Sequence, residues 1–210
     1  TALYRILSDI ELIPPVLFDN GKENKVYKMD AENLSCELRA GSCEKIDIVY
    51  LDPPYNQHPY GSNYHILNTI ALWDKPEINK SILVEGKKTN KSAIRTDWKT
   101  ERRSAYNYKN QATKSLEQLI QSINANFILL SYSTDGHMDL KDVLEILSAN
   151  GELSMVTKSY KRYRVSTQRM SEKPYNVEAV FILNKNKKSE KGTVEKLWSR
   201  FKEEDSWLNM

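Results

Sequence analysis

The sequence predicts an α/β fold built around a mostly parallel sheet. Short segments rich in β-branched and aromatic residues alternate with longer segments of helical periodicity, an order typical of this class. Hydrophobic residues make up 40% of the 210 residues, which is enough for one globular core. No apolar run reaches the roughly 18 residues that a membrane-spanning helix requires, so no membrane span is expected.

The individual elements follow from apolar periodicity and from polar or glycine-containing boundaries. Strands are expected over residues 25–29, 46–51, 127–132, 152–157 and 177–183. Helices are expected over residues 31–38, 64–73, 108–125, 138–147 and 194–201. Asp135 is a candidate for the start of the helix at 138–147, and Asn150-Gly151 is a typical helix end.

The strongest chemical signal is Asp52-Pro53-Pro54-Tyr55, which directly follows the apolar segment 46–51. Two prolines fix φ and remove two backbone donors, so the strand must end there and the chain must leave the sheet as a rigid loop. Open α/β sheets bind ligands at the carboxyl ends of their strands. An ordinary turn after a strand is the competing interpretation of the tetrapeptide alone.

This loop and its flanks resemble motif IV of the D12-class (alpha-group) adenine-specific DNA N6-methyltransferases. The resemblance runs from Ile48 to Pro76 and includes the polar and aromatic continuation up to Tyr60. It implies a class I (Rossmann-like) methyltransferase sheet with strand order 3-2-1-4-5-7-6, S-adenosylmethionine as cofactor and double-stranded DNA as substrate. Such enzymes are typically the modification enzymes of restriction systems. The alternatives are methylation of RNA or of protein glutamine, and a non-catalytic DNA-binding fragment or subunit that needs a partner chain.

The resemblance also implies roles for single residues. Asp52 and the carbonyl of Pro53 would accept the two hydrogens of the adenine amino group and turn its lone pair toward the methyl group. Tyr55 would stack on the base, which has to be flipped out of the duplex to be reached. Asp30, Asp52 and Pro54 are expected to contact the cofactor, although Asp30 is an equally good N-cap for the helix at 31–38.

Further polar, basic and aromatic residues are candidates for contacting DNA, because cations suit phosphates and aromatic rings suit bases and sugars. They are Tyr60, Asn63, Tyr160, Lys161, Arg162 and Tyr163. A solvated basic surface is the competing interpretation of the cluster at 160–163. The net charge of +3 favours nucleic acid only weakly.

A glycine motif of the form Phe-x-Gly-x-Gly, with which this family opens, is absent, since no two of the 7 glycines fall within one turn. The expected strands would then be the third to the seventh of the family's sheet, without its first two. The chain also begins with Thr1. We therefore expect the carboxyl-terminal part of a larger enzyme, or one half of a split one whose amino-terminal portion is a separate chain. A divergent complete protein with another glycine loop is the alternative.

The organisation along the chain follows from the same interpretation. Residues 1–184 are expected to form a partial catalytic domain with a polar insertion at 75–105 that contacts DNA, and residues 185–210 a polar tail with a short helix. Cys36 and Cys43 fit plain thiols of a reducing, bacterial-type cytoplasm. The histidines show no metal-binding pattern, so no metal site is expected.

Overall fold

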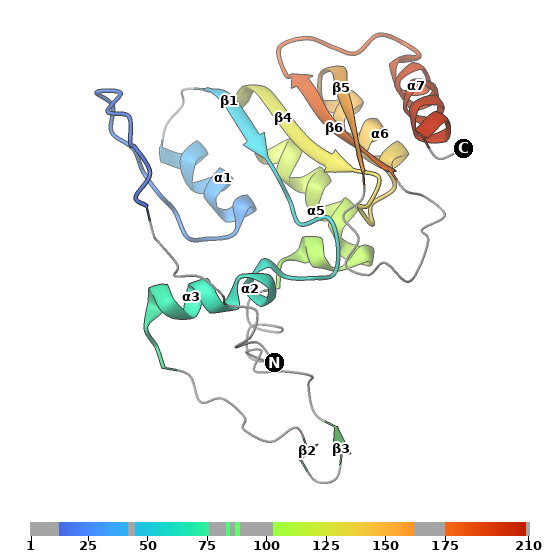
Figure 1. Cartoon of the computed structure of the whole chain (residues 1–210). Coiled ribbons are helices and arrows are strands. Elements are labelled where there is room, and N and C mark those ends of the chain that lie inside the picture. The colour runs from blue at the N-terminus through green and yellow to red at the C-terminus, as the bar shows by residue number, and fades with distance from the viewer. Residues whose placement is uncertain are drawn as a thin grey trace.

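A computed structural model of the chain describes residues 13–41, 45–75, 83–84, 87–88, 103–161 and 175–208. Its main sheet has the strand order β1-β4-β6-β5 (Figure 1). These strands are β1 (Ile46–Leu51), β4 (Ala125–Ser133), β6 (Tyr175–Asn184) and β5 (Glu152–Lys161). A separate antiparallel pair consists of β2 (Leu83–Val84) and β3 (Lys87–Lys88). The chain therefore has a mixed α/β structure, consistent with a methyltransferase fold.

The prediction of a mostly parallel sheet is wrong for these strands. β1 and β4 are parallel, but β6 is antiparallel to both β4 and β5. A parallel pair needs a crossover connection, usually a helix, whereas antiparallel strands can follow each other directly. The sequence between β5 and β6 is short and polar and contains Pro174. It shows no helical pattern, and this absence already indicated that no crossover helix joins the two strands.

Helices cover one face of the sheet. They are α1 (Ala31–Gly41), α5 (Lys109–Ser122), α6 (Leu140–Asn150) and α7 (Thr193–Leu208). α5 packs between α1 and α6, and α7 packs on α6, β5 and β6 (Figure 1). Because side chains alternate along a strand, the buried residues toward these helices recur with period two. The core of this layer contains Ile128, Leu130, Tyr132, Phe181 and Leu183.

Several helix boundaries differ from their predictions. The helix expected at 64–73 is divided into α2 (Tyr60–Asn63) and α3 (His65–Leu72), because Tyr64 has a backbone conformation outside the helical region, with φ −103° and ψ 19°. α6 begins after Asp139, whose Oδ1 accepts a hydrogen bond from the backbone N of Lys141 at 2.7 Å. Asp135 is therefore not its cap. α7 is longer than the helix predicted at 194–201.

The segment at 25–29 is not a strand, which corrects the prediction made for it. It contains β-favouring residues, but Val26 is 98% exposed and no strand of the described residues pairs with this segment. β-propensity describes a fit to a neighbouring pleated surface, so it forms no strand where a pairing partner is lacking.

The opposite face of the sheet carries exposed apolar side chains. On β1, Ile48 is 58% and Tyr50 is 60% exposed, and on β5 Val156 is 59% exposed. Phe127 on β4 is also exposed and lies beside Ile48 in the register of the sheet. β1 is an edge strand that pairs only with β4 in the described sheet. The apolar pattern at 46–51 is typical of a buried strand, but none of the six residues of β1 is buried in the described structure.

Candidate active site

The candidate site lies at the carboxyl end of β1, which pairs in parallel with β4. Pairing of β1 ends at Leu51, opposite Leu130, and the loop of Asp52 to Tyr55 (the DPPY loop) begins at the next residue. This confirms the prediction that the strand ends at the two prolines. Asp52 is exposed at the carboxyl end of β1, so its carboxylate is open to a ligand.

Tyr55 turns back toward the sheet rather than into solvent. Its hydroxyl lies 2.9 Å from the Oγ of Ser131 and donates to the Oε1 of Glu178 at 3.3 Å. Its ring packs edge-on against Tyr132, with 5.1 Å between the ring centroids. Burial, together with the carboxylates of Asp52 and Glu178, raises the pKa of Tyr55 well above its usual value. The side chain is therefore a neutral phenol with a fixed orientation.

A cavity of about 650 Å³ lies on the other side of the DPPY loop. Its volume is within the range of small-molecule sites, which is roughly 300–1,000 Å³. The three residues that we expected to contact the cofactor, Asp30, Asp52 and Pro54, all line it, together with Pro53 and Arg103. The Oδ1 of Asp30 also accepts a hydrogen bond from the backbone N of Glu32 at 2.9 Å, so its function as a helix cap is present as well.

Tyr106 lines the same cavity and was not singled out from the sequence. It is 8% exposed, and its hydroxyl is buried without a hydrogen-bond partner among the described residues. Burial first, then the carboxylates of Glu32 and Asp30, raise its pKa. A buried polar atom without a partner is uncommon in native proteins, and a bound ligand is one way to satisfy it. The donors and acceptors around this cavity thus fit a small polar ligand.

Tyr60 and Asn63 belong to α2, which begins a few residues after the DPPY loop. The ring centroid of Tyr60 lies 6.0 Å from that of Tyr64. Burial and the nearby charge of Asp52 raise the pKa of Tyr60. Asn63 ends α2.

Tyr160 and Lys161 are the last residues of β5 and are exposed. The hydroxyl of Tyr160 accepts a hydrogen bond from the Nδ2 of Asn176 at 3.3 Å, and this nitrogen also donates to the Oδ2 of Asp135 at 2.6 Å. Tyr160 therefore lies near the segment that follows β4. Arg162 and Tyr163 lie outside the described residues.

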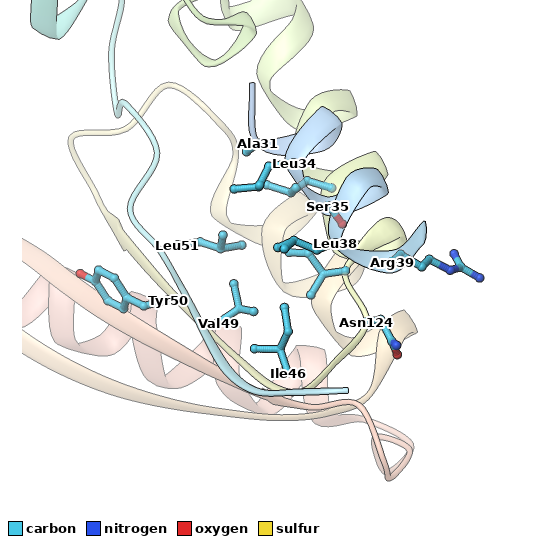
Figure 2. A pocket seen from close by; sticks show the side chains of 12 residues that line it. Ala31, Leu34, Ser35, Leu38, Arg39, Ile46, Val49, Tyr50, Leu51 and Asn124 are labelled. Atoms are coloured by element: carbon cyan, nitrogen blue, oxygen red, sulfur yellow. The ribbon is translucent and has the colours of Figure 1, made fainter. Parts of the chain in front are cut away.

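A second cavity, of about 290 Å³, lies between α1 and β1 (Figure 2). Its walls are mainly apolar and come from Leu34 and Leu38 of α1, Val49 and Leu51 of β1, and Ile123 after α5. No titratable cluster suited to catalysis lines it. It is a gap in the helix-side packing next to the unpaired edge of β1.

Comparison with known proteins identifies the family. The model of the D12 class N6 adenine-specific DNA methyltransferases matches residues 5–128, which is more than half of the chain. The chain belongs to this family. No solved structure matches the chain.

Curated relatives are similar over most of this chain. The modification methylase StsI of Streptococcus sanguinis is 31% identical over 195 residues, covering 91% of this chain and 27% of the relative. The type II methyltransferase M.NlaIII of Neisseria lactamica is 34% identical over 153 residues, covering 72% of this chain and 40% of the relative. The type II methyltransferase M.FokI of Planomicrobium okeanokoites is 32% identical over 171 residues, covering 80% of this chain and 23% of the relative. The chain thus spans less than half the length of these relatives.

Among the residues that the structure describes, no helix is long and apolar enough to cross a membrane. No group of three or more histidine, cysteine, aspartate or glutamate side chains in that part of the chain could hold a metal ion.

Proposed function

We propose that this chain carries the methyl-transferring loop of a DNA adenine-N6 methyltransferase, the modification enzyme of a restriction-modification system. One observation carries the proposal: an exposed carboxylate, two prolines and an anchored tyrosine lie at the carboxyl end of a parallel strand pair, beside a cavity that Asp30 also lines. Family membership supports the same activity. Since its substrate is DNA, we place the protein in the bacterial-type cytoplasm.

The chain's own groups would act by positioning and electrostatics. Asp52 and the carbonyl of Pro53 accept the two amino hydrogens of a flipped adenine, and Tyr55 holds the base by stacking. Asp30, Asp52 and Pro54 form the wall of the cavity that would hold S-adenosylmethionine, and the unpartnered hydroxyl of Tyr106 offers another polar contact there. When bound, this cofactor supplies an electrophilic methyl group.

We further propose that the sheet is part of a class I methyltransferase sheet. The order β1-β4-β6-β5 corresponds to strands 4-5-7-6 of the order expected for the family. In that order another strand lies next to strand 4, on the side where β1 has an unpaired edge. The apolar cavity beside β1 (Figure 2) supports the same idea, and so does the exposed apolar face of the sheet. An amino-terminal portion, in the same chain or in a partner chain, would supply the missing strands.

A non-catalytic DNA-binding subunit is the second candidate. It is favoured by the lining of the cofactor cavity, which contains no glycine. Methylation of RNA or of protein glutamine gains no support from the family match.

The reaction itself provides the decisive test. An active preparation of the protein, incubated with double-stranded DNA and radiolabelled S-adenosylmethionine, should place the label on N6 of adenine, as read by nucleoside analysis of the digested DNA. Single-stranded RNA and a denatured protein mixture serve as parallel substrates. Label on cytosine, on RNA or on protein would contradict the proposal, and a preparation that binds DNA without transferring the label would favour the non-catalytic subunit.

The basic cluster gives a prediction about salt. If Lys161 and Arg162 both contact phosphates, replacing both by glutamine should weaken binding to any duplex. It should also reduce the slope of log affinity against log salt by about two units, because each lost phosphate contact removes roughly 0.9. Fluorescence anisotropy at several salt concentrations measures this slope. Replacing Lys187 and Lys188, exposed lysines after β6, should leave it unchanged. An unaltered slope in the first variant would identify the cluster as a solvated surface.

A further inference from the structure

Asn107 is a buried polar residue that the proposed chemistry does not use. It is 3% exposed and ends the short 3-10 helix η2 (Ala105–Asn107), just before α5. Both ends of its amide are hydrogen-bonded. The Oδ1 accepts from the backbone N of Ser104 at 3.1 Å, and the Nδ2 donates to the backbone carbonyl of Asn56 at 2.9 Å. The second bond joins residues that are 51 positions apart.

The partner of this bond matters because of where it lies. Asn56 directly follows the DPPY loop, in which Pro53 and Pro54 have no backbone N–H groups with which to fix the chain. The carbonyl of Tyr55 accepts a hydrogen bond from the backbone N of His137 at 2.9 Å. The next carbonyl, that of Asn56, accepts the bond from Asn107. Two consecutive carbonyls at the end of the loop are thus held from two different elements.

The bond also connects two segments that line the cofactor cavity. Arg103 and Ser104, which directly precede η2, line this cavity together with Asp52, Pro53 and Pro54 of the DPPY loop. Ser104 and Asn107 form a reciprocal capping box, so the turn is itself rigid. A rigid turn that is hydrogen-bonded to the end of the loop fixes the loop relative to this part of the lining.

We propose that Asn107 is a positioning residue for methyl transfer: its side-chain amide holds the carbonyl of Asn56 and thereby fixes the DPPY loop relative to the cofactor cavity. The inference rests on the proposed function of that loop. Asn107 touches neither base nor cofactor in this scheme and acts through the loop. Misplacement of a reacting group by about 1 Å can cost on the order of 100-fold in rate. Loss of this bond should therefore reduce the transfer step more than it reduces binding.

Asn107→Asp is the sharpest variant. Aspartate has the same shape and keeps an oxygen for the backbone N of Ser104, but it replaces the Nδ2 donor by an oxygen that faces the carbonyl of Asn56. Asn150→Asp is the matched control. The Nδ2 of Asn150, the last residue of α6, donates to the backbone carbonyl of Ile146 at 2.8 Å, and Asn150 does not line the cofactor cavity. Both variants replace an amide donor to a backbone carbonyl by a carboxylate, and only Asn107→Asp breaks a bond to the residue that follows the DPPY loop.

In an active preparation of the protein, Asn107→Asp should lower the single-turnover rate of methyl transfer by ~10- to 100-fold. The affinities for DNA and S-adenosylmethionine should change by less than about threefold, and Asn150→Asp should keep its transfer rate within about twofold. The fluorescence of 2-aminopurine at the target base reports whether flipping is retained, and thermal unfolding reports whether the fold is intact. Asn107→Ala, which removes both hydrogen bonds without adding a charge, is the second variant if the aspartate impairs folding.

Several results would overturn the proposal. These are a transfer rate above half of wild type in Asn107→Asp, an equal loss in Asn150→Asp, or a defect that disappears at saturating DNA or cofactor. If neither Asn107→Asp nor Asn107→Ala folds, the residue serves stability rather than positioning, and the proposal also fails. If no preparation transfers methyl groups to adenine at all, the proposed function has failed first, and that outcome is recognised because it affects the wild-type protein.

Discussion

Asp52→Ala should abolish methyl transfer while sparing the affinity for DNA. The carboxylate acts as acceptor for the amino group of the flipped base and does not approach phosphates. It lies exposed at the end of β1, so its removal leaves no cavity in the core and should disturb the fold little. Removal of one preorganised electrostatic group typically costs ~10²–10³ in turnover.

The measurement is the single-turnover rate at saturating DNA and S-adenosylmethionine, with affinity for a duplex measured in parallel. Glu145→Ala is the matched control, because Glu145 is an exposed carboxylate on α6, away from the DPPY loop. A variant at Asp52 that retains more than about a tenth of wild-type turnover, a change of only about 1.4 kcal/mol, would rule out the assigned role. An equal loss in Glu145→Ala would indicate a general effect of charge.

The sequence was informative where local chemistry decides the structure. The two prolines after Leu51 end β1 at the predicted residue, because they cannot continue a hydrogen-bonded ladder. Four of the five predicted strands are present, since their apolar runs meet a neighbour in the sheet. The segment at 25–29 has a similar composition but no neighbour, and it forms no strand. Strand formation depends on pairing, which a local pattern does not contain.

The long-range contacts that hold the DPPY loop could not be predicted from local sequence patterns. Asn107 lies 51 residues from Asn56, and Glu178 lies 123 residues from Tyr55, so neither pair shares a local pattern. Weak signals existed. Ser104 and Asn107 have the spacing of a capping box, and Glu178 is a lone charge within an apolar strand. The resemblance implied only a stacking role for the ring of Tyr55, whereas in the structure its hydroxyl also has two hydrogen-bond partners.

Ile48→Asp should destabilise the 210-residue chain only slightly and the complete enzyme strongly, if the open face of the sheet is covered by an amino-terminal portion. In the 210-residue chain Ile48 is 58% exposed, so a carboxylate there stays in water. The free energy of unfolding of this chain should fall by at most about 1 kcal/mol, the spread of strand propensities. In the complete enzyme the same carboxylate would be buried without a partner, which costs about 3–5 kcal/mol. Chemical denaturation of both proteins, with methyl transfer as a second readout, measures the difference.

Ile48→Val is the control, because it keeps an apolar, β-branched side chain and should be mild in both settings. The comparison separates two explanations of the exposed apolar face. If Ile48, Tyr50 and Phe127 face solvent in the complete enzyme too, the aspartate should be tolerated equally in both proteins, and the proposal of a covering portion would be wrong. If the face is covered, the aspartate should be tolerated only in the shorter chain. A large difference is expected because exposed apolar residues gathered on an edge strand and its neighbour are typical of a surface that another part of a protein covers.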